Sequence, residues 1–265
     1  MNAFRSGWAT RFAMLAILAY AVYAASLLDF SWARFETGLD NGARFLGRMF
    51  PPDFRRWDVL LDGILESLQM AALASALGIL ISLPLGILGA RNLMPGWITW
   101  PVRAVVSLAR TLHPVIVAIL FVKAVGFGAL AGILALAVAS IGFIGKLFTE
   151  AIEEISMKQI EAVRATGASF MNVVTFGVVP QVLGRFVGFA TYQLDSNLRN
   201  STMVGIVGAG GIGGTLFSAF QRFDYDFVLA ILLTIIAIVM IGEVLARMVR
   251  AVFVDGRGIS FGDDA

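Results

Sequence analysis

The chain has 265 residues, of which 58% are hydrophobic and only 14% are charged, and its formal net charge is +2. A soluble globular domain is nearer half apolar and a quarter charged, so this composition indicates one integral membrane domain rather than one or two soluble domains. The small net charge gives no support for nucleic acid as a partner, and the lack of cysteine excludes disulfides and thiolate-bound metals.

Long apolar runs mark the membrane spans, because a helix needs about 20 predominantly apolar residues to cross the hydrocarbon layer. Open sheet edges are not tolerated in lipid, and the sequence has no alternating pattern typical of a barrel. We therefore expect a single all-α domain over residues 1–265, a polytopic bundle of about six transmembrane helices. The predicted spans cover residues 12–28, 67–90, 98–122, 124–145, 184–206 and 227–249.

The first span, 12–28, follows Arg5 and Arg11 and contains small residues at Ala24–Ala25, so it also fits a cleaved signal peptide. We expect it to be retained, because its apolar run is longer than the usual core of a signal peptide. The distribution of Lys and Arg over the connecting segments favours a topology with both termini in the cytoplasm. The same topology places residues 149–181 in the cytoplasm.

The longest connection, 29–66, contains the stretch GARFLGRMFPPDF. Its apolar residues lie near helical spacing between Arg44 and Arg48, which predicts a short helix in the membrane interface that Pro51–Pro52 would end. Such a helix would serve as an anchor in lipid or as a contact for a binding protein, and we favour the anchor.

Residues 149–181 form a polar island between two apolar spans, and they include the stretch EAVRATGASFMNVVTFGVVPQ. We interpret the island as two short helices, since Gly167 allows a turn and Pro180 can start the helix of the next span. Small and charged residues share one face of the first helix at spacings of three, four and seven: Glu161, Arg164, Ala165 and Ala168. An exposed helix of this kind favours insertion into a partner's cleft, and an ordinary loop with interfacial helices is the alternative.

No motif supports an enzyme. The sequence lacks the phosphate loop G-x-x-x-x-G-K-[ST], the zinc motif H-E-x-x-H and the nucleophile motif G-x-S-x-G, and its single histidine, His113, cannot form a multi-histidine metal site. The glycines of GAGGIGG, 208–214, imitate a dinucleotide fingerprint, but they follow a membrane span rather than the strand of a βαβ unit. A helix break or close packing of backbones explains them better. We expect no catalytic residue, metal or cofactor in this chain.

The island resembles the cytoplasmic signature of permease subunits of ABC importers, which is Glu-Ala-Ala, three residues, Gly, nine residues, then Ile-x-Leu-Pro. Glu161, Ala162, Gly167 and Pro180 stand at the matching places, whereas Val163, Gly177 and Val179 depart from the signature. A closer resemblance, over most of the chain after Phe50, is to the permease subunit of the phosphonate importer and its phosphite-transporting relatives. It is carried by FPPDF, FVKAVGFGALAGILALAVASIGFIGKLFTEAIEEI, EAVRATGAS, VVPQVL, DSNLRNSTMVGIVGAGGIG and DYDF.

The resemblance implies the permease fold of type I ABC importers in the bacterial inner membrane. It implies a homodimer of permease chains in membrane lipid, two ATPase subunits that bind ATP and Mg, and a periplasmic binding protein that delivers the ligand. The coupling helix that docks into the ATPase would lie in the island, with Glu161, Ala162, Arg164, Gly167, Ala168 and Pro180 as its residues. In the fifth span, Asp195, Asn197 and Arg199 match the family pattern, whereas His113–Pro114 of the third span departs from the family's Pro-Glu.

Ionisable residues inside spans must face a bundle interior or a wet cavity. Arg110 and His113 are three residues apart on one helical face, and Asp195 and Arg199 are four apart on another, close enough to pair. With Asn197, they are the predicted translocation path, in which Arg110 and Arg199 would bind a phosphorus oxyanion. The alternative is a structural salt bridge in which Asp195 only neutralises Arg199.

Two classes of function follow. The first is an ABC importer permease for phosphonate or a related oxyanion such as phosphite or hypophosphite, with another small solute such as methionine as the alternative substrate. The second is a self-contained channel or secondary transporter that uses the charges of Asp195 and Arg199. Secondary transporters often show inverted repeats, and we find no convincing internal repeat in this sequence.

Overall fold

The computed structural model describes residues 7–27 and 31–253, without the side chains of Ala9 and 249–253. Every regular element in these ranges is helical. The chain divides into two units, Met1–Pro51 and Pro52–Ala265, which are described separately. Five helical segments are long and apolar enough to cross a membrane, and a bent helix pair would make a sixth.

The first unit contains α1 (Trp8–Leu27) and α2 (Trp32–Met49). Residues Thr10–Leu27 of α1 have the length and hydropathy of a membrane span. The predicted interfacial helix ends where expected, since Met49 is the last residue of α2 and Phe50 precedes the two prolines. It begins ten residues before Gly42, however, because no proline stands between Ser31 and Pro51 to interrupt the helix.

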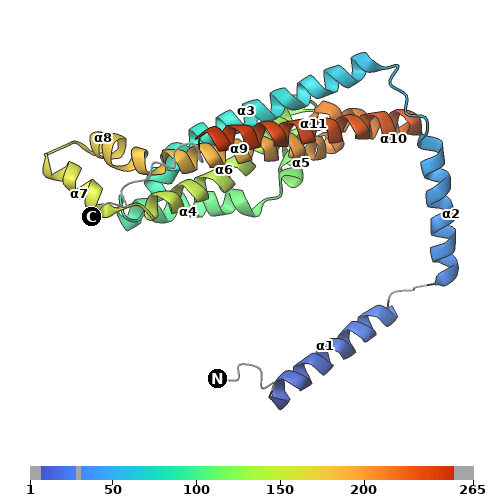
Figure 1. Cartoon of the computed structure of the whole chain (residues 1–265), viewed down its shortest axis with the longest axis horizontal. Helices are drawn as coiled ribbons and strands as arrows, with labels where there is room; N and C mark the ends of the chain where they lie inside the picture. The colour runs from blue at the N-terminus through green and yellow to red at the C-terminus, as the bar shows by residue number, and fades with distance from the viewer. Residues whose placement is uncertain (1–6, 28–30, 254–265) are drawn as a thin grey trace. The chain divides into compact units, whose positions relative to one another are not determined.

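Four long helices form the centre of the second unit: α3 (Trp57–Gly89), α6 (Ala129–Glu153), α9 (Val179–Val204) and α11 (Tyr225–Phe253). They run alongside one another in Figure 1, with the short helices α7 and α8 at one end. Small residues let α3 and α6 approach closely: a Cβ added at Gly78 would lie 2.3 Å from the Cβ of Ser140, and one added at Gly86 would lie 2.7 Å from the Cβ of Phe148. Close contact through small residues is typical of helices that pack within membranes.

The third predicted span, 98–122, is not one straight helix. It consists of α4 (Gly96–Thr111) and α5 (Pro114–Val125), which are bent by 92°. Proline disfavours the helical conformation of the residue before it, and His113 accordingly has φ −68° and ψ 136°. Pro114 then starts α5, where its missing N–H costs little.

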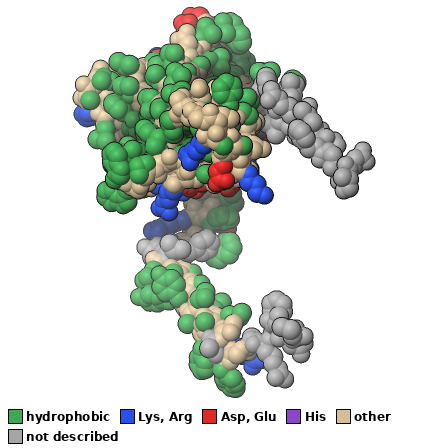
Figure 2. Space-filling model, turned by 90° about the vertical axis from the view of Figure 1, so that its left-hand side faces the viewer, with side chains coloured by type: hydrophobic (Ala, Val, Ile, Leu, Met, Phe, Trp, Pro, Cys, Tyr) green, Lys and Arg blue, Asp and Glu red, His purple; other side chains and the backbone are tan. Residues whose placement is uncertain are grey.

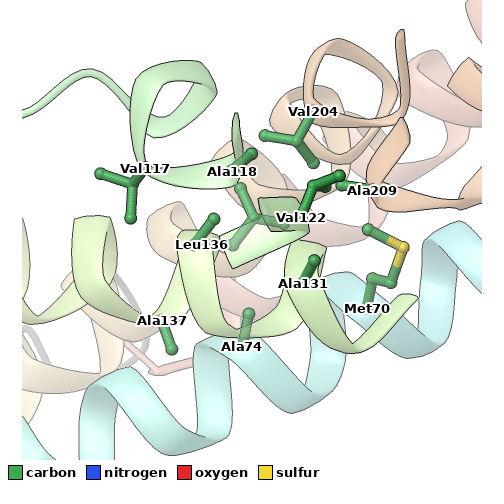
Figure 3. Close-up of a cluster of buried hydrophobic side chains, with 11 residues drawn as sticks. Met70, Ala74, Val117, Ala118, Val122, Ala131, Leu136, Ala137, Val204 and Ala209 are labelled. Carbon is green, nitrogen blue, oxygen red and sulfur yellow. The ribbon is translucent and has the colours of Figure 1, made fainter. Parts of the chain in front are cut away.

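Helix α5 is packed into the bundle despite its short length. Figure 3 shows its residues Val117, Ala118 and Val122 among Leu136 of α6, Met70 of α3 and Val204 at the end of α9. All six side chains are buried. The bend at Pro114 therefore places α5 against the core instead of continuing the direction of α4.

The fourth span is also displaced from the prediction of 124–145. Gly126 and Gly128 have φ values of +95° and +123°, and they separate α5 from α6, which begins at Ala129. Helix α6 continues beyond the apolar run to Glu153, and an ion pair of 2.8 Å joins Lys146 to Glu150 on its surface. The end of an apolar run is thus not the end of the helix, and 149–153 belong to α6 rather than to the predicted loop.

Helix α3 also extends beyond its apolar run. It begins at Trp57 instead of residue 67 and includes three acidic residues in its first turns. The last predicted span, 227–249, lies within α11. Between them, a salt bridge of 3.1 Å joins Arg56 to Asp224, and the guanidinium of Arg56 lies 3.7 Å from the ring centre of Phe227. These contacts fasten the start of α3 to the start of α11.

The helix of the fifth span begins at Phe170, well before the predicted boundary of 184. It runs through α8 (Phe170–Asn172), a π-helical segment η1 (Val173–Val178), α9 and a second π-helical segment η2 (Gly205–Ala209). Pro180 lies in the first turn of α9, as predicted, but η1 precedes α9 without a break, so the helical run begins before Pro180. The wider turn provides bonds such as that from the Val179 N–H to the Val174 carbonyl, so the helix continues past a residue that cannot donate.

Candidate functional site

The polar island carries a short helix, α7 (Met157–Ala165), whose inner face is fixed by a buried side chain. Ile160 has no exposed surface and packs with Val173, Val178 and other apolar residues. A Cβ added at Gly177 would lie 3.6 Å from the Ile160 Cα, so α7 lies close to η1. Ile160, with the partly buried Met157 and Val163 beside it, therefore anchors α7 to the bundle.

The outer face of α7 is exposed and includes Glu161, Ala162 and Arg164. Gly167 follows the helix with φ +76°, a conformation that other residues rarely adopt, and turns the chain toward α8. The prediction that Ala168 shares the face of Glu161 is wrong, because α7 ends at Ala165. Ala168 is instead partly buried against the apolar cluster around Ile160. Figure 2 views the molecule from this end, where acidic, basic and hydrophobic side chains are all exposed.

Two contacts hold the start of α7 against α9, and sequence reasoning missed both. The Ser156 N–H, just before α7, donates to Oε1 of Gln181 at 2.9 Å, and Nε2 of Gln181 donates to the carbonyls of Gly177 at 2.6 Å and Ser156 at 3.4 Å. One turn farther along α9, Arg185 forms an ion pair of 2.5 Å with Glu154. The only signal in the sequence was the position of Gln181 directly after Pro180.

The adjoining ends of α3, α4 and α6 are joined around Glu153. Its carboxylate accepts from the Arg91 N–H at 2.9 Å and forms an ion pair with Arg103. Nε of Arg103 donates to the Gly89 carbonyl at 2.8 Å, and Asn92 donates to the Ile152 carbonyl at 2.7 Å. Arg103, which lies within the predicted span 98–122, therefore has a structural role here.

Arg110, the other charge of the third span, lines a hollow of about 280 Å³ between α4 and α9. A Cβ added at Gly142 of α6 would lie 2.5 Å from the backbone nitrogen of Arg110, so α4 packs directly on α6 at this point. The side chain of Arg110 is exposed, and no carboxylate of the described residues lies within 4.0 Å of it. Polar side chains of α9 line the other wall: Tyr192, Gln193, Ser196 and Asn200.

Asp195 and Arg199 form the predicted ion pair, with 2.7 Å between Oδ2 and Nη2. The Asp195 side chain is 10% exposed and that of Arg199 is 43% exposed, so only the arginine reaches the surface of the chain. The other carboxylate oxygen of Asp195 is buried without a hydrogen-bond partner in the described chain. It faces α11, where a Cβ added at Gly242 would lie 3.9 Å from it.

Asn197 and His113 form hydrogen bonds with groups other than the two arginines. Asn197 is completely buried in a network in which it donates to Ser75 and Ser140, each at 2.9 Å, and accepts from Gln193 at 3.0 Å. Gln193 also donates to Ser140 at 2.8 Å, so the network joins α3, α6 and α9. His113 caps α5 by accepting from the Val115 N–H at 3.3 Å. Of the five predicted path residues, only Arg110 lines the hollow.

The glycine-rich segment 208–214 both breaks the helix and packs closely, as the sequence predicted. Gly208, Gly210 and Gly211 have positive φ values, and a short helix not predicted from the sequence, α10 (Gly211–Gln221), follows them. The carboxylate of Glu66 accepts from the Gly211 N–H at 2.8 Å, and the Ser67 hydroxyl accepts from the next N–H at 2.9 Å. These two residues of α3 therefore cap α10.

Residues 82–253 match the protein family described as "Binding-protein-dependent transport system inner membrane component". The chain belongs to this family. The permease is 36% identical over 258 residues to the phosphite transport system permease protein PtxC of Stutzerimonas stutzeri, an alignment that covers 96% of this chain and 93% of the relative. It is 40% identical over 206 residues to the phosphate-import permease protein PhnE of Mycolicibacterium smegmatis, which covers 77% of this chain and 39% of that relative.

Methionine permeases are more distant. The probable D-methionine transport system permease protein MetI of Vibrio cholerae is 26% identical over 210 residues, or 72% of this chain and 92% of the relative. A chain of the methionine ABC transporter MetNI, in an inward-facing conformation, superposes with a TM-score of 0.66 at 28% identity, covering 76% of this permease and 99% of that chain. The expected family and the importer permease fold are thus confirmed. The exposed helix α7 carries Glu161 and Ala162 of the coupling signature, Gly167 follows it, and Pro180 lies in α9.

Proposed function

We propose that this permease is the membrane-spanning subunit of an ABC importer for phosphonate or a related phosphorus oxyanion, such as phosphite or hypophosphite. The observation that carries the substrate class is the 36% identity to the phosphite permease PtxC over nearly the whole of both chains. Arg110, which has no carboxylate partner in the described chain, faces polar side chains of α9 across the hollow and so supports an anionic substrate independently of the relatives.

In this proposal, α7 is the coupling helix that docks into a separate ATPase subunit. Its anchored inner face and exposed outer face support the role. The outer face is accessible to the ATPase, and the anchored inner face would transmit the motion of the ATPase to the helix bundle. ATP and Mg would be bound by the ATPase, and this chain would bind no cofactor. A second copy of the permease would complete the path, and a periplasmic binding protein would deliver the ligand.

We also propose the topology that these partners require. The chain lies in the bacterial inner membrane, with α7 and both termini in the cytoplasm and α10 toward the periplasm. The path runs along the exposed side of α9, where Arg199 is accessible and Arg110 lies across the hollow. Asp195 limits the charge of Arg199, while Asn197 and His113 support the path by fixing α9 and α5.

The substrate class is tested by uptake in cells that lack their own transporters for these solutes and express the permease with its ATPase and binding protein. We expect the cells to take up labelled phosphite. Excess phosphonate should inhibit this uptake, and excess methionine should not. Methionine is the second candidate because the MetNI chain shares the fold at 28% identity. Uptake of methionine without uptake of any phosphorus oxyanion would replace the proposed substrate.

Coupling is tested at Ala162, which is exposed on α7. We predict that Ala162→Trp prevents co-purification of the ATPase or separates ATP hydrolysis from uptake, because the larger side chain blocks the docking face. Gly167→Trp is less clean, since φ +76° makes any side chain at this position strain the turn. Gly38→Trp in α2 is the control, because no atom lies within 4 Å of a Cβ added there. Normal ATPase recovery and normal uptake in Ala162→Trp would exclude α7 as the docking helix.

A further inference from the structure

We propose that the translocated oxyanion binds transiently in the hollow between α4 and α9, with Arg110 as the charged ligand and Ser196 and Asn200 as hydrogen-bond donors. The inference rests on the proposed function and locates the substrate within this chain. It assigns the contact to Arg110 rather than to Arg199, and it adds Ser196 and Asn200 of α9 to the predicted path residues.

The charge of Arg110 is the first argument. The helices α4, α6 and α9 carry five Lys or Arg residues, and within the described chain Arg110 alone of these has no carboxylate partner. The four ion pairs are Arg103–Glu153, Lys146–Glu150, Arg185–Glu154 and Arg199–Asp195. An arginine at membrane depth needs water or an anion to compensate its charge. A guanidinium with free donors can bind a phosphorus oxyanion through two parallel bonds.

The lining of the hollow is the second argument. Gln193, Ser196 and Asn200 follow one another at spacings of three and four, so they lie on one face of α9, opposite Arg110. The residues that line the hollow include no Asp or Glu. Such a site favours an anion over a zwitterion, because the ammonium group of an amino acid would find no carboxylate there.

The size and the fixed walls of the hollow suit a small ion. Its volume of about 280 Å³ leaves space for a small oxyanion and some water. Gly142 fixes the backbone of Arg110, and the buried bonds of Gln193 to Ser140 and Asn197 fix the neighbouring turn of α9. The backbone that carries Arg110 and the turn of α9 beside Ser196 are therefore held in place before the substrate arrives.

The hollow also meets the requirement that a transport site release its ligand. It offers one cation and neutral hydrogen-bond donors. The hydrogen bond from Asn200 to Ser196 is long at 3.4 Å, so Asn200 can give up this bond and donate to a substrate oxygen instead. A transport site must bind strongly enough to admit the ion and weakly enough to release it. By contrast, the guanidinium of Arg199 is already engaged at 2.7 Å by Asp195.

The test compares Arg110→Gln with wild type in proteoliposomes that contain the permease and its ATPase, with liganded binding protein outside and ATP inside. We expect kcat/KM for phosphite uptake to fall about tenfold or more, because a charged hydrogen-bond partner is lost. Recovery of the ATPase should not change. The control is Arg222→Gln, an exposed arginine whose side chain bonds, among the described residues, to the Ser218 carbonyl at 3.2 Å, and it should transport normally.

Asn200→Asp provides a second, nearly isosteric variant that keeps the test decisive if Arg110→Gln fails to assemble. The new carboxylate would neutralise Arg110 and repel the substrate, so phosphite uptake should fall at least tenfold while the complex with the ATPase forms. Wild-type kcat/KM in an assembled Arg110→Gln or Asn200→Asp variant would overturn the inference. A wild-type complex that takes up no phosphorus oxyanion would instead contradict the proposed function, so the two failures are distinguishable.

Discussion

Replacement of Gln181 by Leu should loosen the coupling helix without unfolding the bundle. The side chains have similar volume, but leucine cannot accept from the Ser156 N–H at 2.9 Å or donate to the Gly177 carbonyl at 2.6 Å. A hydrogen bond contributes about 1 kcal/mol net, and water can reach Ser156, so the loss should be about 1–2 kcal/mol. That corresponds to roughly a 5- to 30-fold rise in the population of states in which α7 is detached.

The remaining contact cannot replace Gln181. Arg185 and Glu154 form their ion pair at 2.5 Å with side chains that are 51% and 66% exposed. An exposed pair of this kind typically contributes less than about 1 kcal/mol and weakens with salt. Ile160 should still hold the middle of α7, so the predicted opening is confined to the connection between α6 and α7.

Amide hydrogen exchange, followed by mass spectrometry on the purified permease, measures this opening directly. We expect residues 155–160 to exchange roughly 5- to 30-fold faster in Gln181→Leu than in wild type, by the same estimate. Uptake per ATP hydrolysed should also fall in the reconstituted complex. Gln221→Leu is the matched control, because Gln221 is exposed on α10. Unchanged exchange around Ser156 in Gln181→Leu would refute the reasoning.

Two further substitutions test packing inside the bundle by thermal unfolding of the purified permease. Gly213→Ala should lower stability by about 1–3 kcal/mol, because its Cβ would lie 1.9 Å from the Thr202 carbonyl oxygen. Gly214→Ala should be nearly neutral, since the nearest atom is 3.7 Å away, and equal effects at the two glycines would contradict the close packing. Asn197→Leu should cost about 2 kcal/mol or more, because it leaves the hydroxyl of Ser75 without its buried donor. A variant as stable as wild type would show that the network is not needed.

The membrane class, the approximate positions of the long apolar helices and the exposed helix followed from the sequence because they depend on local pattern. Apolar runs identify spans wherever they stand, and the signature from Glu161 to Pro180 is contiguous. The bend at Pro114 was readable in principle, since proline disfavours a helical residue before it. Residues 98–122 are apolar over a length that fits one span, which favours a single helix. Proline within such a helical pattern nevertheless ends or kinks the helix.

Side-chain partners were harder to predict because they depend on which helices meet. The sequence grouped Asn197 with Asp195 and Arg199, but consecutive positions of a helix point about 100° apart, and Asn197 turns inward to Ser75 and Ser140. Ser196 and Asn200 share a face, a spacing visible in the sequence, but only the packing of α4 against α6 at Gly142 brings Arg110 opposite them. Likewise, the capping of α10 by Glu66 joins residues 145 positions apart.

The central claim is that this permease moves a phosphorus oxyanion only when α7 couples it to a separate ATPase. The most direct measurement is accumulation of labelled phosphite in proteoliposomes that contain the permease and its ATPase, with liganded binding protein outside and ATP or no nucleotide inside. The account predicts accumulation with ATP, none without it, and none when the permease is reconstituted alone. Equal accumulation without ATP, or by the permease alone, would identify a self-contained channel or secondary transporter and contradict the account.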